Sequence, residues 1–518
     1  MNRFQVVNYI VIILSALLFT VPFLYKELSF LAWICLVPLF YIIDNKNAPG
    51  PFKAGLIFGT ALNYMGQYWL VGTLARFGGF PLPIGIFFIL VYCMFLGIQY
   101  GIFTYLTAKF NLLRNLRPHN LLFIAAIWVS LDYFYPHLFP YSIGNSQGLN
   151  LHVIQVVDLL GVSFLSFLVV FVNLAVYSVC RSLYLRDNKP VFAAVSVLMV
   201  LAFLFIYGSY RIQSEEENIS KAEKIEVGIV QANFDFLEKI ENNSYLIIQA
   251  HKRMSQGLEN ADLIIWPESA VLEFLPPDSE YLEIEGEIAV PRMKDKFFLT
   301  GGLSFEFDET KNFGPDQYDF IQYNSAFLTD GYGKILGKYN KIKLLLFGEY
   351  LPFSDIFPSI KMLSPASGDF TPGSDLNILN IYEKGIKIAP LICYEDIIPR
   401  FSREFAKKGA NILINITNDA WFGKSFAPYQ HLLVAVPRAV ETRRYLIRST
   451  NTGVSVIVDS TGKIKSQTGI FTEEVMTGEV ALLYGDTLYT RVGDIFPWIC
   501  FSAFILYIFN KYLRKRYS

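Results

Sequence analysis

The chain has 518 residues, of which 53% are hydrophobic, 16% are aromatic and only 17% are charged. This composition is too apolar for an ordinary soluble protein and indicates a membrane protein with two or more domains. The formal net charge of -1 predicts no nucleic-acid partner, because phosphate binding needs a concentrated excess of lysine and arginine. The five cysteines, an odd number, argue against a disulfide framework.

Apolar stretches dominate the first 208 residues, and a helix that spans a bilayer needs about 20 such residues. The first stretch lacks a convincing small-residue cleavage site, so we expect it to be retained. Asp132 and Asp158 lie within predicted spans, where they either mark function or pair inside the bundle. We predict eight spans, at about Asn8–Tyr25, Leu28–Ile43, Ala54–Thr73, Pro83–Ala108, Leu121–Phe139, Val153–Val179, Val191–Gly208 and Phe496–Tyr512.

The loops between these stretches carry positive charge asymmetrically. If the N-terminus is cytoplasmic, the inner segments hold most of the basic residues, and the opposite loops hold only Lys26 and Arg76. Positive charge favours the cytoplasmic side of a membrane. Seven crossings then place the following segment on the outer face. We therefore predict a seven-span bundle (1–210), an outer domain (211–489), and a last helix with a basic cytoplasmic tail (490–518).

The outer segment has the pattern of a globular domain. It begins with a polar linker, Ser214–Lys224, after which short apolar runs alternate with amphipathic helices, as in α/β or layered α+β domains. Its longest irregular loop is Leu351–Gly373. Strands are predicted at 225–232, 261–268, 296–302, 323–330, 386–395, 411–419 and 453–460, and helices at Ser244–Leu258, Pro399–Lys408 and Tyr429–Tyr445.

Reactive side chains stand where some of these strands end. In the run "IIWPES", a hydrophobic strand ends on Glu268, where the neighbouring Trp and Pro would partly desolvate the carboxylate and raise its pKa, as suits a general base. The run "LICYED" offers Cys393, and a cysteine becomes a nucleophile only as its thiolate, with a base and a positive charge nearby. The run "KYNKIKLLLFGEY" offers Glu349 and three lysines, Lys338, Lys341 and Lys343.

These residues also have structural interpretations. Cys393 could be a small buried hydrophobe, Glu268 a solvated turn residue, and the lysines a wet face. His431 in "PYQHLL" fits a structural polar contact, and Trp421 in "TNDAWFG" fits an aromatic plug in an ordinary loop. Five histidines without a His/Cys cluster predict no metal site.

A glutamate, a lysine and a cysteine, in that order and each near its own strand end, resemble the catalytic set of the nitrilase (carbon–nitrogen hydrolase) superfamily. Over nearly its whole length the chain resembles the membrane-bound apolipoprotein N-acyltransferase family within it. The resemblance implies a polytopic α-helical membrane bundle plus an extramembrane nitrilase-like αββα sandwich. Its motifs are "YWLVGTLARFGGFPLP" and "GVSFLSFLVVFVNLAV" in the membrane part, and "WPES", "YNKIKLLLFGEYLPF", "LICYED", "NITNDAWFGKSFAPYQH", "RRYLIRSTNTGVS" and "YTRVGDIFPW" elsewhere.

The family pattern implies that Cys393 is the nucleophile, Glu268 the general base and Lys341 the cation that stabilises the oxyanion. Lys341 is preferred over its two neighbouring lysines because it stands eight residues before Glu349 of "FGEY". Glu349 then orients Lys341 or the substrate amine.

Further supporting residues follow from the same resemblance. Tyr394 and Glu395 match positions that shape the site, with the backbone N–H of Tyr394 as a second oxyanion donor, and Trp421 is a further supporting residue. The chain departs from the family in having Leu346 where proline is usual, and in lacking a Pro and a Trp after "GIVQ".

The resemblance implies a two-step acyl transfer without a cofactor. Cys393 takes an acyl chain from a membrane phospholipid as a thioester and passes it to the α-amine of the diacylglyceryl-modified N-terminal cysteine of an apolipoprotein. The protein would lie in the bacterial cytoplasmic (inner) membrane with its outer domain on the periplasmic side. Two alternatives stay open, a membrane-tethered amidase or nitrilase and a non-catalytic nitrilase-like module on a transporter or sensor.

The loop Leu351–Gly373 is predicted to act as a lid. Its apolar side chains could dip into the membrane interface and cover the site. They are Phe353, Phe357, Met362 and Leu363.

Overall fold

The structure is a computed structural model, and it describes residues 3–45, 48–114, 116–185, 191–234, 244–307, 320–346, 348–350 and 369–517. The chain forms two compact units. Met1–Gly72, Pro81–Ser214 and Arg491–Ser518 form the helical unit, whereas Thr73–Phe80 and Glu215–Thr490 form the unit that contains the sheets.

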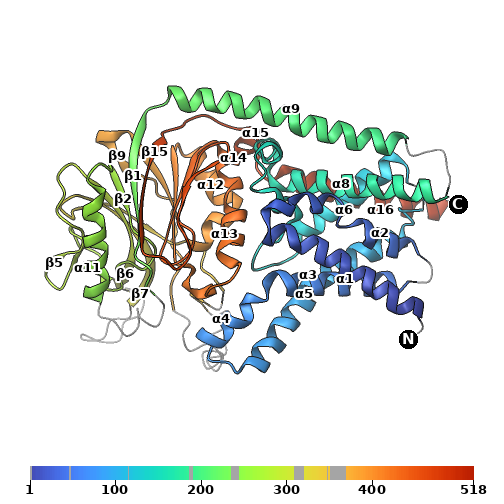
Figure 1. Cartoon of the computed structure of the whole chain (residues 1–518), viewed down its shortest axis with the longest axis horizontal. Coiled ribbons are helices and arrows are strands. Elements are labelled where there is room, and N and C mark those ends of the chain that lie inside the picture. Colours follow the sequence, from blue (N-terminus) through green and yellow to red (C-terminus); the bar gives the residue numbers. More distant parts are fainter. Residues whose placement is uncertain are drawn as a thin grey trace. The chain divides into compact units, whose positions relative to one another are not determined.

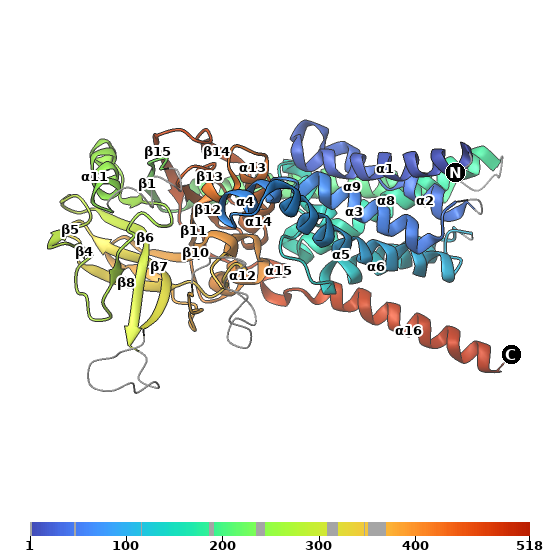
Figure 2. The ribbon, with the colours of Figure 1, turned by 90° about the horizontal axis from the view of Figure 1, so that it is seen from below.

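The helical unit consists mainly of long apolar helices. Figures 1 and 2 show α1, α3 and α5 side by side and α16 against α6. Their continuous apolar sequences suit a lipid environment. The helices are α1 (Arg3–Leu24), α2 (Val37–Asp44), α3 (Pro51–Gln67), α4 (Trp69–Phe77), α5 (Leu82–Lys109), α6 (Pro118–Phe134), α7 (Leu151–Ile154), α8 (Val157–Leu185), α9 (Val191–Lys221) and α16 (Ile495–Tyr517).

Among the described residues, five helical segments are long and apolar enough to cross a membrane. They are Arg3–Leu24, Lys26–Asp44, Leu82–Lys109, Val157–Leu185 and Val191–Lys221. The predicted helical membrane region is therefore confirmed, whereas the number of eight spans stays a prediction.

Some of the predicted segments differ in detail. The span predicted at Leu28–Ile43 is a 3-10 helix (Lys26–Trp33) followed by α2, and the next span is divided between α3 and α4. The segment predicted as a polar linker, Ser214–Lys224, is helical up to Lys221, where α9 ends. Glu and Lys favour helix there, and Glu217 pairs with Lys221 at 2.5 Å, one turn apart.

Asp132 and Asp158, the two aspartates that lie within predicted spans, have partners. Asp158, near the start of α8, accepts hydrogen bonds from the Tyr207 hydroxyl at 2.7 Å and from Arg211 Nε at 2.8 Å, both on α9. Asp132 in α6 accepts a hydrogen bond of 2.5 Å from the Ser142 hydroxyl. Both carboxylates are therefore paired inside this unit, one of the two possibilities that the sequence leaves open.

The second unit contains two large sheets. In one, the strand order is β15-β1-β2-β6-β7-β8, with β3 paired to β6, and in the other it is β14-β13-β12-β11-β10-β9. The first comprises β1 (Lys224–Gln231), β2 (Leu263–Ile265), β3 (Phe274–Leu275), β6 (Phe297–Phe307), β7 (Phe320–Asp330), β8 (Ile335–Asn340) and β15 (Glu474–Ala481). The second comprises β9 (Leu379–Ile381), β10 (Ile386–Ile392), β11 (Ile412–Thr417), β12 (Tyr445–Thr450), β13 (Val456–Val458) and β14 (Ile464–Gln467).

Helices cover the outer faces of both sheets. In Figure 1, α11 lies on the sheet that contains β1, whereas α12 and α13 lie on the sheet that contains β10. The layers are therefore αββα, as predicted. The helices are α11 (Ser244–Ser255), α12 (Pro399–Lys407), α13 (Ala427–Ala435) and α14 (Pro437–Thr442).

Strands β10, β11 and β12 run parallel, with Ile388 opposite Ile412 and Ile412 opposite Tyr445. All residues of β11 and β12 are buried, because both faces of this sheet are covered. The carboxyl ends of the three strands meet at one edge of the sheet, where functional groups commonly collect. The helix predicted at Tyr429–Tyr445 is instead α13 and α14, and Tyr445 already begins β12.

Candidate active site

The candidate nucleophile stands on a sharp turn. Strand β10 ends at Ile392, and a one-turn 3-10 helix, η6 (Cys393–Ile397), begins at the next residue, so the predicted strand is wrong beyond Ile392. Cys393 has a φ of 51°, in the left-handed region, which costs a residue with a side chain roughly 1–2 kcal/mol. Asn415 of β11 supports the turn, because its Nδ2 donates to the Cys393 carbonyl at 3.0 Å.

Glu268 lies just beyond β2 and is 5% exposed. Its Oε1 accepts a hydrogen bond of 2.7 Å from Asn324 Nδ2 on β7 and lies 3.5 Å from Lys341 Nζ. Its Oε2 accepts a hydrogen bond of 3.0 Å from the backbone N–H of Asn418, just beyond β11. Strand β6 passes so close that a Cβ at Gly301 would lie 2.6 Å from the Glu268 Cα.

Lys341 follows β8 and is 1% exposed. Its Nζ lies 2.7 Å from Glu349 Oε2 and 3.5 Å from Glu268 Oε1. The Asn324 Nδ2 also donates to Glu349 Oε1 at 2.8 Å, so one amide group bridges the two carboxylates. The two carboxylates and the ammonium group thus form one buried hydrogen-bonded cluster.

The electrostatics of this cluster set the protonation states. Burial alone would lower the pKa of Lys341, but Glu349 and Glu268 outweigh it and raise the pKa, so the side chain stays cationic. Burial raises the pKa of the Cys393 thiol, the negative charge of Glu268 adds to this, and Lys341 opposes it. In the resting site the sulfur therefore carries its proton, and a base must take that proton before the sulfur can attack.

Glu395 connects the cysteine turn to the lysine loop. It is fully buried, and its Oε2 accepts from the Ile392 N–H at 2.9 Å. Its Oε1 accepts from the Tyr339 hydroxyl at 2.9 Å and from the N–H groups of Ile342 and Lys343 at 2.8 and 3.0 Å. Burial raises the pKa of Glu395 to about 7, against the backbone donors and Lys341, which favour the carboxylate.

The neighbouring lysines are not part of this buried cluster. Lys338 Nζ lies 3.5 Å from Glu306 Oε1 and is partly exposed, and the side chain of Lys343 is exposed. Of the three candidate lysines, the structure therefore brings Lys341 to Glu268.

The remaining predicted residues lie at the edges of the cluster or beyond it. Tyr394 is half-buried, and burial raises the pKa of its phenol to about 12. Trp421 is half-buried, and its carbonyl accepts a hydrogen bond of 3.0 Å from Thr73. Leu346 is 36% exposed. The predicted lid residues 353, 357, 362 and 363, and residues 235–243 after "GIVQ", lie outside the described residues.

Three asparagines of this site were not predicted. Asn324, Asn415 and Asn418 position Glu268 or Cys393 through the hydrogen bonds given above. The signal for two of them was an amide side chain in the buried strand patterns "YNSAFLTD" and "NILINITND", where an unpaired polar group would be costly.

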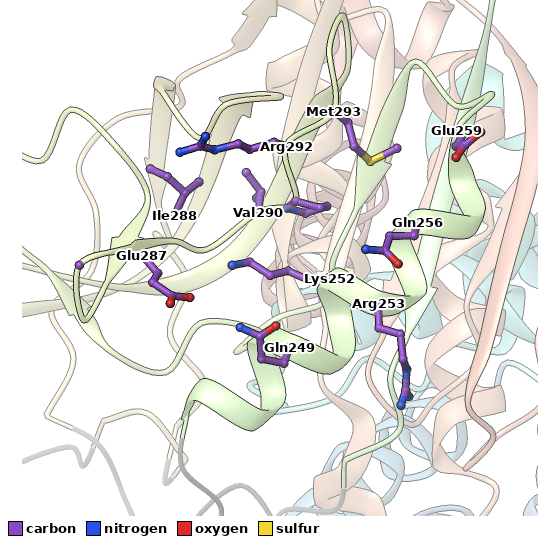
Figure 3. A pocket seen from close by; sticks show the side chains of 12 residues that line it. Gln249, Lys252, Arg253, Gln256, Glu259, Glu287, Ile288, Val290, Arg292 and Met293 are labelled. Atoms are coloured by element: carbon purple, nitrogen blue, oxygen red, sulfur yellow. The ribbon is translucent and has the colours of Figure 1, made fainter.

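A separate cavity of about 790 Å³ lies in the same unit. Figure 3 shows Gln249 and Lys252 of α11 on one side and Ile288 and Arg292 on the other. Its lining contains none of the predicted site residues.

Comparison with known proteins agrees with this architecture. Residues 226–487 match the carbon–nitrogen hydrolase family, and residues 15–175 match the apolipoprotein N-acyltransferase N-terminal domain. Yeast Nit3 of the nitrilase superfamily (Saccharomyces cerevisiae) covers 50% of this chain and 90% of its own, with 20% identity and a TM-score of 0.35. The two family matches identify the second unit as the carbon–nitrogen hydrolase domain of an acyltransferase.

Two curated relatives extend the similarity to the whole chain. The apolipoprotein N-acyltransferase of Geobacter metallireducens is 32% identical over 98% of this chain and 96% of its own length. That of Bdellovibrio bacteriovorus is 30% identical over 87% of this chain and 83% of its own. The chain belongs to the apolipoprotein N-acyltransferase family and is a membrane protein. These relatives do not favour the two alternatives, a water-using hydrolase and a non-catalytic module.

Proposed function

We propose that this enzyme moves an acyl chain from a membrane phospholipid to the α-amine of the N-terminal diacylglyceryl-cysteine of an apolipoprotein, through a thioester on Cys393. Family membership supports the overall reaction. The observation that supports the site is the buried cluster in which Lys341 Nζ lies 3.5 Å from Glu268 Oε1 and both groups act electrostatically on Cys393.

In the first step, Glu268 takes the thiol proton and the Cys393 sulfur attacks the ester carbonyl carbon of the phospholipid. Lys341 stabilises the negative oxygen of the tetrahedral intermediate. The intermediate then collapses, the ester C–O bond breaks, and Glu268 returns the proton to the departing lysophospholipid. The raised pKa of the thiol makes this proton transfer necessary.

In the second step, the lipoprotein amine attacks the thioester and Glu268 accepts a proton from the attacking nitrogen. The C–S bond breaks, an amide forms, and Cys393 regains its proton from Glu268. Glu349 holds Lys341 at 2.7 Å throughout, while Tyr394 and Trp421 shape the surroundings. We expect ping-pong kinetics, because the first product leaves before the amine reacts.

The proposal includes the orientation and limits of the parts. The catalytic domain (211–489) would lie on the periplasmic side of the bacterial inner membrane, between the bundle (1–210) and the last helix (490–518). Both substrates are lipid-anchored, so a site near the outer membrane interface would receive them without extraction from the bilayer.

Intact-mass analysis tests the thioester directly. After incubation with phospholipid alone, the protein should gain the mass of one acyl chain, which hydroxylamine removes. Cys393→Ala should abolish the gain, whereas Cys180→Ala, at an exposed cysteine, should retain it. A diacylglyceryl-cysteinyl peptide should discharge the thioester. If the wild type gains no mass, or if water discharges the thioester as fast as the peptide does, the proposed transfer is wrong.

A further inference from the structure

A second buried cluster of charged groups adjoins the Cys393 turn. It consists of two carboxylates and two cations whose side chains are all at least nine-tenths buried. Four different elements contribute one side chain each: η6, the 3-10 helix η7 (Asp419–Phe422), α13 and β12. The residues are Asp396, Asp419, His431 and Arg448.

The geometry around the imidazole defines its charge. His431 Nε2 lies 2.9 Å from Asp396 Oδ1, and His431 Nδ1 lies 3.0 Å from Asp419 Oδ1. When both carboxylates are ionised, each only accepts hydrogen bonds, so both ring nitrogens donate and the ring is an imidazolium. Arg448 Nη1 contacts Asp396 Oδ2, and its Nη2 lies 3.8 Å from Asp419 Oδ2. Two positive charges thus balance two negative ones.

The two aspartates belong to the two turns on which the chemistry depends. Asp396 lies in η6, the turn that begins with Cys393. Asp419 directly follows Asn418, whose backbone N–H donates to Glu268 Oε2 at 3.0 Å. His431 therefore ties the turn of the nucleophile to the turn that holds the base. Displacement of either turn by 1 Å is enough to slow a reaction about a hundredfold.

We propose that the His431 imidazolium is a positioning residue. Its hydrogen bonds to Asp396 and Asp419 fix Cys393 relative to Glu268 for thioester formation. This inference rests on the proposed function, because it assigns His431 a role in the acylation of Cys393. Loss of the ring proton would leave one nitrogen lone pair facing a carboxylate. The buried cluster would then carry a net negative charge, and one aspartate would separate from the ring.

The groups that face His431 give the sign of the pH dependence. Burial and Arg448 would lower the pKa of His431, but Asp396 and Asp419 outweigh them and raise it. Because the folded-state pKa is raised, His431 donates both hydrogen bonds below the ordinary histidine pKa of about 6.5. It loses one of them only as the pH rises through the higher folded-state pKa. The rate of thioester formation should therefore fall as the pH rises above the folded-state pKa of His431.

The first test compares His431→Gln with the wild type in the intact-mass assay. Glutamine has one donor and one acceptor, so it can satisfy only one of the two carboxylates. We expect the acylation rate to fall on the order of tenfold to a hundredfold, with little change in the phospholipid concentration that gives half the maximal rate. His431→Gln should also lack the fall in acylation rate at alkaline pH that we assign to His431. The matched control is His251→Gln, at another buried histidine, which should keep the alkaline loss.

A compensating variant separates positioning from misfolding. In His431→Gln combined with Asp419→Asn, the glutamine can donate to Asp396 and accept from the new asparagine amide. This restores both hydrogen bonds and leaves Arg448 and Asp396 as a neutral pair. We expect the double variant to recover much of the rate and to show no alkaline loss from this cluster, which a merely structural role would not produce.

Nitrogen-15 histidine spectra of the purified protein give a readout independent of activity. The signals that disappear in His431→Gln should report two protonated ring nitrogens near neutral pH. A neutral-imidazole pattern, or a His431→Gln protein that forms the thioester at the wild-type rate with the wild-type pH profile, would overturn the inference. A wild-type protein that forms no thioester would instead overturn the proposed function.

Discussion

Glu395 illustrates how one side chain can connect two parts of the candidate active site. A single carboxylate accepts four hydrogen bonds, one from the end of β10 and three from Tyr339 and the loop that follows Lys341. The ionised form has acceptor capacity for all four donors, whereas a neutral carboxylic acid must use one oxygen as a donor. The charge state of this residue therefore bears on the arrangement of the site.

The pKa of about 7 for Glu395 predicts that activity falls at acidic pH, as an acid limb of the pH–rate profile. As the pH falls below this value, the carboxylate takes up a proton and the rate of thioester formation should drop about tenfold per pH unit. The folded pKa is raised, so between this value and the ordinary one the folded state binds more protons than the unfolded chain does. Stability should therefore not fall over the same range, and the loss of activity is not unfolding.

Measurement of thioester formation and of thermal unfolding from about pH 5 to about pH 8 checks this prediction. Glu395→Gln should be slow at all pH values and should lack the acid limb. Glu383→Gln, at an exposed glutamate of the same unit, should behave as the wild type does. Parallel loss of activity and stability on acidification would contradict the prediction.

At the scale of secondary structure, the backbone of β6 closely approaches Glu268, the proposed base. A Cβ at Gly301 would lie 2.6 Å from both the Glu268 Cα and the Pro267 carbonyl oxygen, whereas a Cβ at Gly302 would lie 3.1 Å from the nearest atom, on the Phe327 ring. A side chain can shift to relieve a contact more easily than the backbone can.

Gly301→Ala should therefore displace Glu268 and reduce thioester formation about a hundredfold, with a loss of roughly 1–3 kcal/mol in stability. Gly302→Ala is the matched control on the same strand and should keep most of the activity. Intact-mass kinetics and thermal unfolding measure both effects. Equal activity of the two variants would show that β6 does not position the base.

The sequence predicted well those buried strands whose residues are mostly apolar. Strands β10 and β11 are mostly apolar, with Lys387 and Asn415 as the main exceptions, and the predicted strands at 386–395 and 411–419 begin within one residue of them. Strand β12, "YLIRST", was missed because it contains Arg448 and directly follows Arg443 and Arg444. Arg444 and Arg448 are nevertheless buried, with Arg444 Nε donating to the Ala410 carbonyl at 2.8 Å.

The residues of the candidate site also fall into those that the sequence could predict and those that it could not. Glu268, Lys341 and Cys393 could be predicted because each stands near a recognisable strand end and matches a family motif. The role of Asn324 could not, because it depends on β7 bringing the amide between two carboxylates that are 81 positions apart along the chain, at 268 and 349. Pairings of this kind arise from strand order, which local periodicity does not encode.

At the scale of the whole molecule, the membrane orientation is the main prediction. Tyr382 in the carbon–nitrogen hydrolase domain and Tyr184 at the end of α8 are both 86% exposed. If the N-terminus is cytoplasmic, the domain lies outside and the end of α8 lies inside.

Single cysteines at these two positions can be compared in a Cys180→Ser background, because Cys180 is the cysteine described as exposed and the other four are buried. In spheroplasts, an impermeant maleimide should label Tyr382→Cys and should label Tyr184→Cys only after permeabilisation. Wild-type acyl transfer by both variants is the control for folding. The reverse pattern of labelling would invert the proposed orientation.

The left-handed backbone at Cys393 has one more consequence. Glycine adopts a φ near 51° without steric cost, so a chain free of any demand for catalysis would gain stability by exchanging this cysteine for glycine. An inactive descendant of this enzyme would be expected to drift toward that exchange. At this position the proposed nucleophile is thus retained at a cost in backbone strain that glycine would avoid.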